Sequence, residues 1–201
     1  MRYGAVSIGV VLCLLAGPGR AVDCAGVEKD PDMVKARAMA VLAREPGNMA
    51  AQECRATADF HAGEFKAAAA QFLALAGRQA DPAAGAALQS KAGWAFMRNH
   101  ELGQAGKAFH AAIKLQPQAA RYWQDHAMVL MQTEQFWDAR RELDYALTLL
   151  PRDAALWALR ADCWLKLGVA AQAKRDARVA LALEPGQTLA AAVMQKIGAG
   201  E

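Results

Sequence analysis

The chain has 201 residues, of which 55% are hydrophobic, and a formal net charge of +3 at pH 7. This length suffices for one ordinary folded domain. Residues 1–21 contain two arginines and no acidic residue, so their removal would leave a charge of only +1. A nearly neutral chain gives no reason to expect nucleic acid or an anionic membrane as its partner.

The first residues have the pattern of a secretory signal peptide. Arg2 gives a positive start, Ala5–Ala16 is an unbroken run of apolar and small residues, and Ala21 stands where a signal peptidase prefers a small residue. The run is shorter than the roughly 20 residues that span a bilayer. We expect cleavage after Ala21, no membrane span afterwards, and a periplasmic or secreted protein. A signal retained as an anchor is the alternative.

Residues 22–47 are predicted to form an extension and an N-terminal capping helix. Asp30 followed by Pro31 is a good helix start, since aspartate caps the first amides and proline fits the first helical position. The helix should continue to about Arg44 and end before Pro46.

After the capping helix, several residue types recur along the chain with a fixed period. Pro117, Pro151 and Pro185 lie 34 residues apart (151 − 117 and 185 − 151), and Trp123 and Trp157 keep the same spacing. A period of this size is typical of helical repeats. Alanine also recurs in phase, where two helices must approach closely and a larger side chain would overpack the crossing. The two alanine columns are Ala105, Ala139 and Ala173, and Ala112, Ala146 and Ala180.

These residues resemble the tetratricopeptide repeat (TPR) pattern, in which a first helix with tryptophan, leucine-glycine and an aromatic residue precedes a second helix with alanine, a large apolar residue and proline. Four units, about 49–82, 86–119, 120–153 and 154–187, carry the resemblance. Their matching residues are Ala56, Gly63, Phe65, Ala68 and Phe72; Ala92, Gly93, Phe96, Phe109 and Pro117; Trp123, Ala127, Leu130, Leu143 and Pro151; and Trp157, Ala161, Trp164 and Pro185.

The chain departs from the pattern in two respects. Arg55, His126 and Arg160 stand at a position where the family usually has leucine. The proline phase also slips by three residues between the first two units, at Gly77–Gly85, which we interpret as a longer turn within one domain.

The resemblance implies an all-α superhelix (TPR solenoid) of about four helix-turn-helix repeats with capping helices at both ends. The repeats occupy 48–187, and residues 188–201 form the C-terminal capping helix and tail. The expected helices are 48–62 and 65–76, 84–99 and 102–115, 119–132 and 136–149, 153–167 and 170–183, and Thr188–Ile197. Turns are expected at Ala62-Gly63, Asn99-His100, Thr133-Glu134 and Leu167-Gly168.

Three cysteines follow the signal segment. Cys24 in the extension and Cys54 in the first helix of the first repeat form the best disulfide pair, which would hold the extension over the end of the repeats. Two free thiols are the equal alternative, because connectivity cannot be deduced from sequence. Cys163 lies in an apolar helix and is expected to be a buried small hydrophobe.

The sequence contains no recognisable enzyme motif. None of the four histidines has a carboxylate or a second histidine at metal-ligand spacing on one helix, and there is no phosphate-binding glycine loop or nucleophile elbow. We therefore expect no catalytic residues, no metal and no cofactor.

The resemblance instead implies a concave groove lined by the first helix of each repeat. The residues expected to bind a partner there are Phe60, Trp94, Met97, Arg98, Arg121, Gln124, Met128, Met131, Asp162, Leu165 and Lys166. Thr57 and His61 hold equivalent inner positions. Methionine and tryptophan suggest an apolar strip for a protein segment, with basic residues favouring some acidic character. The alternative for these apolar residues is packing between neighbouring helices.

The asparagine-lysine clamp that TPR co-chaperones use for a C-terminal carboxylate is absent, because Thr57, Trp94, Met128 and Asp162 occupy its amide positions. The leading hypothesis is a non-enzymatic adaptor or scaffold of the bacterial cell envelope that binds a peptide or helix of a partner protein. The alternative is a structural subunit of a self-assembling or larger envelope machine for secretion, pilus or cell-wall assembly.

Overall fold

The computed structural model describes residues 24–199, and these form helices without any strand. The expected signal segment, residues 1–21, lies outside the described residues. Within that range, ten helices follow one another along the chain: α1 Pro31–Leu42, α2 Met49–His61, α3 Phe65–Ala76, α4 Pro82–Arg98, α5 Leu102–Leu115, α6 Ala120–Gln132, α7 Phe136–Leu149, α8 Ala154–Lys166, α9 Ala170–Leu183 and α10 Thr188–Gly198.

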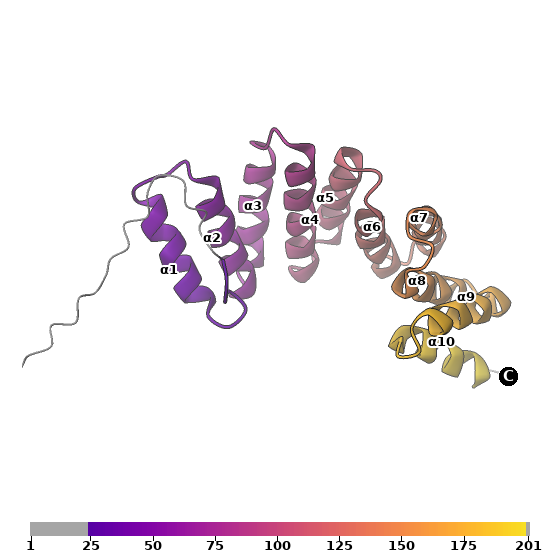
Figure 1. Cartoon of the computed structure of the whole chain (residues 1–201). Coiled ribbons are helices and arrows are strands. Elements are labelled where there is room, and N and C mark those ends of the chain that lie inside the picture. The colour runs from indigo at the N-terminus through magenta and orange to yellow at the C-terminus, as the bar shows by residue number, and fades with distance from the viewer. Residues whose placement is uncertain (1–23, 200–201) are drawn as a thin grey trace, which may run out of the picture.

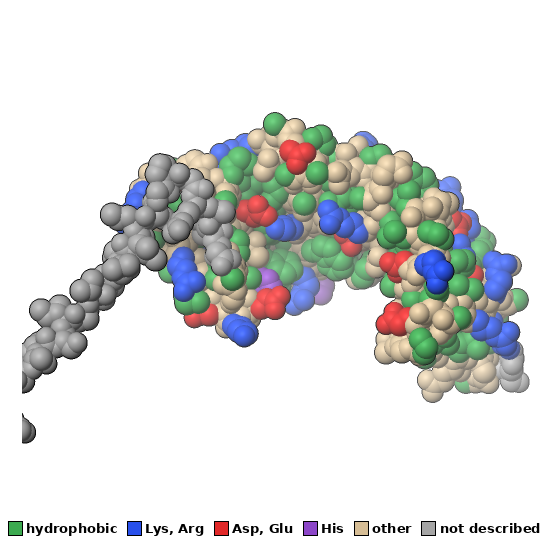
Figure 2. Space-filling view, viewed as in Figure 1, with side chains coloured by type: hydrophobic (Ala, Val, Ile, Leu, Met, Phe, Trp, Pro, Cys, Tyr) green, Lys and Arg blue, Asp and Glu red, His purple; other side chains and the backbone are tan. Residues whose placement is uncertain are grey.

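Each helix packs mainly against its neighbours in the chain, so the hairpins α2–α3, α4–α5, α6–α7 and α8–α9 stack in order into an arch (Figure 1). The underside of the arch is hollowed and carries hydrophobic side chains (Figure 2). Helix α4 also contacts α6, and α8 contacts α10, so the first helices of successive hairpins lie beside one another. Helix α10 thus takes the place of a further first helix. The prediction of an all-α superhelix is confirmed.

The alanine columns lie inside, as expected. All six of their side chains are fully buried, where neighbouring helices pack. Trp123 and Trp157 occupy matching places, since each indole Nε1 donates to the carbonyl oxygen of the proline six residues earlier, at 2.7 Å to Pro117 and 2.8 Å to Pro151. The repeat period therefore corresponds to a repeated structure.

The turn inside each hairpin needs a residue with left-handed backbone. Gly63 and Gly168 have φ of 86° and 77°, and the equivalent positions in the other hairpins are His100 with φ of 61° and Glu134 with φ of 59°. Glycine adopts this conformation without steric cost, whereas other residues bring Cβ too close to the backbone. Two of the four turns therefore contain a strained residue.

The extra three residues between the first two repeats are placed differently from our expectation. Helix α4 begins at Pro82 and has 17 residues, whereas α6 has 13, so the insertion mainly lengthens the start of a helix. Asp81 caps it by accepting from the amides of Ala83 and Ala84 at 3.2 and 3.1 Å. An aspartate cap with proline at the first position starts the helix early.

Helix α1 caps the N-terminal end of the stack, and a disulfide joins Cys24 to Cys54 of α2, with their Cα atoms 5.3 Å apart. Asp30 Oδ1 accepts from the amide of Met33 at 2.8 Å, as the sequence predicted for the helix start. Lys35 Nζ lies 2.6 Å from Oδ1 of Asp59, a buried carboxylate of α2. The cap is thus attached covalently and by an ion pair.

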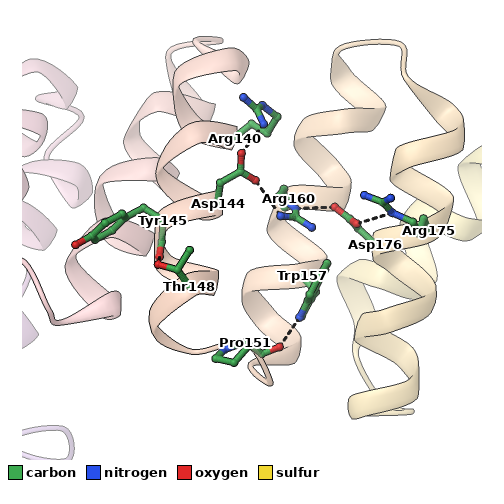
Figure 3. A network of polar contacts seen from close by, with 9 residues as sticks. All are labelled: Arg140, Asp144, Tyr145, Thr148, Pro151, Trp157, Arg160, Arg175 and Asp176. Atoms are coloured by element: carbon green, nitrogen blue, oxygen red, sulfur yellow. Dashed lines mark hydrogen bonds and ion pairs between the residues drawn. The ribbon is translucent and has the colours of Figure 1, made fainter.

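The three departures from the leucine position share a role. Each side chain bonds a polar residue 16 positions later, on the second helix of its own hairpin: Arg55 to Gln71 at 2.7 Å, His126 to Glu142 at 2.7 Å and Arg160 to Asp176 at 2.7 Å. Arg160 also donates to Asp144 of the preceding hairpin at 2.9 Å (Figure 3). Buried charges are stable only when they are paired and hydrogen-bonded, so these contacts replace the usual apolar contact.

Candidate partner-binding groove

Polar side chains join three of the first helices, α2, α4 and α6, to one another. Lys91 of α4 donates to Glu53 of α2 at 2.5 Å, and Ser90 of α4 donates to Asp125 of α6 at 3.0 Å. Burial raises the pKa of Asp125, while hydrogen bonds from Ser90 and Trp94 oppose that shift. These links fix the spacing between the helices that the groove depends on.

A pocket of about 230 Å³ opens between α2, α3 and α4. Phe72 is almost fully buried and so forms its floor, and Phe60 and Trp94 stand on its walls. The Thr57 hydroxyl donates to the carbonyl oxygen of Glu53 at 2.9 Å, within its own helix. The pocket is therefore mainly aromatic. Its lining residues are Thr57, Phe60, His61, Phe72, Lys91 and Trp94.

The ring of Trp94 is supported by Phe109, which lies very close to the backbone of α4. Its ring meets that of Phe109 edge to face, with centroids 5.8 Å apart. Phe109 is fully buried against Gly93, where an added Cβ would lie 2.6 Å from the ring. A contact that short is not sterically allowed, so glycine at position 93 lets Phe109 support the wall of the pocket.

A second pocket, of about 350 Å³, adjoins the first at the α2–α3 turn and shares Phe60 and His61 with it. Its other walls include Phe65 and Arg98. The Arg98 guanidinium lies over the Phe65 ring at 5.1 Å from the centroid. This cation–π contact orients an exposed positive charge at the edge of the aromatic surface.

The structure therefore brings together three of the residues expected in the groove, Phe60, Trp94 and Arg98. Met97 does not belong with them. Its side chain is only 8% exposed and packs in a cluster with Phe109 and Val129, so it contributes to the core and offers little surface to a partner. The period placed it at an inner position, but the close packing of α4 on α5 and α6 buries it.

The other expected groove residues lie on α6 and α8 and line neither pocket. Met131 and Leu165 pack against the core beside them, in accordance with the alternative of helix packing. The Arg121 guanidinium bonds the Tyr122 hydroxyl and lies over its ring. Lys166 is exposed. The side chains of Gln124, Met128 and Asp162 are half-buried.

Sequence reasoning did not single out two residues of the first pocket, Lys91 and Phe72. Lys91 gave no signal, because its role depends on Glu53, 38 positions earlier. Phe72 was named only as a match to the family's second-helix pattern, and it is also part of the core. The ring of Phe72 thus belongs to the core and also forms the floor of the pocket.

Among residues 24–199, no three histidine, cysteine, aspartate or glutamate side chains are arranged to hold a metal ion. None of the described helices is both long and apolar enough to cross a bilayer. Cys163 is fully buried, and burial raises the pKa of its thiol to about 12, so it remains protonated.

No model of a known protein family matches the chain, and no curated protein matches its sequence. Solved structures match its fold. MamA is 16% identical with a TM-score of 0.70 over 79% of this chain and 91% of that chain. YrrB, described as a TPR protein with an unusual peptide-binding site, is 15% identical with a TM-score of 0.67 over 82% and 84%.

A third similar structure is the first TPR of Spaghetti (RPAP3) bound to an HSP90 peptide, 18% identical with a TM-score of 0.55 over 57% of this chain and 91% of that chain. At such low identity the similarity establishes the fold alone. The chain folds as an all-α TPR superhelix.

Proposed function

We propose that this protein is a non-enzymatic adaptor or scaffold that binds a peptide or helix of a partner protein on the concave side of its superhelix. The observation that carries the proposal is the aromatic pocket between α2, α3 and α4, whose walls include Phe60 and Trp94. A mainly apolar concavity with a few polar groups is the usual form of a binding site.

Binding would depend on a preformed shape. The hairpins are held in place by buried alanine columns and by bonds such as Lys91 to Glu53, so the pocket walls lose little freedom when a ligand arrives. A preorganised site spends less of its interaction energy on ordering side chains. Two proteins with this fold, YrrB and RPAP3, are described with a peptide-binding site and with a bound HSP90 peptide, which supports a peptide ligand here.

We also propose that the protein works in the bacterial cell envelope. The pattern of residues 1–21 supports export. The bond between Cys24 and Cys54 supports an oxidising compartment, because disulfides form and persist there and are rare in a reducing cytosol.

The test is a pull-down from a periplasmic extract with the native protein and with a variant carrying Trp94→Ala and Met128→Ala. We expect the variant to lose the bound proteins while its circular dichroism spectrum is unchanged. Trp137→Ala is the control, since Trp137 is 57% exposed on α7 and lines neither pocket. The same proteins bound by a folded double variant would refute the groove proposal.

A further inference from the structure

Taken together, the two pockets of α2–α4 favour an extended ligand. They share Phe60 and His61, so a chain that occupies one of them can continue into the other. The first pocket, at about 230 Å³, is smaller than the roughly 300–1,000 Å³ of common small-molecule sites. One apolar side chain of a peptide therefore suits it better than a cofactor.

The two pockets differ in whether their positively charged side chain already has a negatively charged partner. Lys91 is already paired with Glu53, and no carboxylate is among the residues that line either pocket. Arg98 forms no ion pair with any residue in the described range 24–199, and its guanidinium is held over Phe65. The second pocket thus presents an oriented cation without a counter-charge, which complements an acidic group.

The nearest carboxylates in the sequence do not line this site. Glu101 accepts from the Asn99 amide at 2.5 Å. Glu64, which precedes Phe65, is not among the residues that line the second pocket, and its charge contributes to raising the pKa of Lys35 of α1. An external carboxylate is therefore the natural partner for Arg98.

The spacing of the two subsites determines the spacing in the ligand. Trp94 and Arg98 are four residues apart on α4, which corresponds to about 6 Å along a helix. In an extended chain, residues two apart point to the same side and lie roughly 6.5–7 Å apart. We infer, on the basis of the proposed function, that the groove binds an internal, extended segment of a partner protein in which a bulky apolar residue and an aspartate or glutamate lie two positions apart.

The acidic group is a side chain of the ligand and not its C-terminus. A terminal carboxylate needs several convergent amide or amine donors, whereas Arg98 is the one unpaired cation that lines the two pockets, apart from the ring of His61. Amidation of the peptide terminus should therefore leave affinity unchanged.

The test uses the purified protein and a display library of extended nine-residue peptides with five randomised central positions. We expect enrichment of an apolar residue and an acidic residue that lie two positions apart. Enrichment of another spacing, of basic residues, or of no motif at all would overturn the inference. A helical ligand would instead enrich an apolar and an acidic residue three or four positions apart.

The selected peptide, capped at both ends and labelled, is then titrated by fluorescence anisotropy against variants. Arg98→Glu should weaken binding about tenfold or more, and a peptide with lysine in place of its acidic residue should recover affinity for that variant alone. Arg178→Glu, an exposed arginine on α9, should leave affinity unchanged. Absence of the charge-swap recovery would overturn the role of Arg98.

Trp94→Ala removes a side chain that also contacts Phe109, so a second variant tests the apolar subsite. Thr57→Phe adds bulk at the half-buried pocket wall without deleting a core group, and it should abolish peptide binding. If Thr57→Phe blocks binding and Arg98→Glu has no effect, the groove proposal stands and the acidic motif fails. If neither variant changes peptide binding, both fail.

Discussion

The indole Nε1 of Trp157 donates to the carbonyl oxygen of Pro151 at 2.8 Å. Pro151 follows α7 and Trp157 lies in the first turn of α8, so the bond closes the turn between two hairpins. Trp123 and Pro117 repeat the arrangement one period earlier. The proline ends one helix, and its otherwise unused carbonyl anchors the tryptophan of the next.

Phenylalanine at position 157 removes this bond and keeps an aromatic ring in the same place. Trp157→Phe should lower the free energy of unfolding by about 0.5–1.5 kcal/mol, the usual net value of one hydrogen bond, plus a small packing loss. Urea denaturation followed by circular dichroism measures it. Trp137→Phe, at an exposed position, should have almost no effect, and equal losses in the two variants would contradict the anchoring role.

The strained turns predict a stabilising substitution. Glu134 has φ of 59°, a conformation that costs a non-glycine residue roughly 1 kcal/mol. Glu134→Gly should therefore raise the melting temperature, whereas Gly168→Ala, at the equivalent turn with φ of 77°, should lower it. Differential scanning calorimetry of both variants checks the sign. A lower melting temperature for both would show that the turn residue contributes something other than its backbone conformation.

The alanine columns predict a large loss on overpacking. Ala139 is fully buried in the cluster that joins α6, α7 and α8, so Ala139→Phe should destabilise the fold by about 1–3 kcal/mol or more. Ala171→Phe, at an exposed position of α9, is the control. An unchanged unfolding midpoint for Ala139→Phe would mean that this column is not a helix crossing.

Cys163 should be unreactive in the folded protein. Its pKa of about 12 lies above the ordinary value of 9.0, because burial disfavours the thiolate. Alkylation with iodoacetamide between pH 7 and pH 9.5, followed by mass spectrometry of the peptide that contains Cys163, should show no label until urea is added. Because the folded-state pKa is the higher one, ionisation opposes folding, so stability should fall as pH rises from 9.0 to about 12. Labelling of the native protein at pH 8 would contradict this account.

We expect the stability of α1 to depend on the disulfide between Cys24 and Cys54. Cys24 and Cys54 are 30 residues apart, and closing a loop of this length stabilises a fold by about 3.6 kcal/mol in the chain-entropy description. Cys24→Ser should therefore speed amide hydrogen exchange in α1 and lower global stability, with exchange in α8 and α9 much less affected. Uniform protection of α1 in this variant would show that Val34, Ala38 and the Lys35–Asp59 pair suffice to hold it.

Most of the fold could be predicted from the sequence because repetition made local signals unambiguous. Trp123 and Trp157, the prolines and the alanine columns each occur in phase, and a structure built from equivalent hairpins places them equivalently. The start of α4 was misjudged because Asp81 and Pro82 form a helix start that lies outside the repeat pattern.

The site was harder to predict because it depends on side chains from distant positions. The period placed Met97 in the groove. Whether such an inner residue is exposed depends on how tightly the next helix packs, and the side chain of Met97 is buried in the core. The pairing of Arg160 with Asp176 left a signal, a side chain with ring or guanidinium nitrogens followed by a carboxylate 16 positions later, that recurs at His126 and Glu142. Recognising this pattern requires knowing which faces of the two helices in a hairpin pack together.

Arg160 holds Asp144 of one hairpin and Asp176 of the next with a single guanidinium (Figure 3). In a linear array, cooperativity between neighbouring units comes from the contacts they share. We therefore expect the α6–α7 and α8–α9 hairpins to melt as a single block, so that a substitution that breaks the Arg160 bonds should loosen both of them.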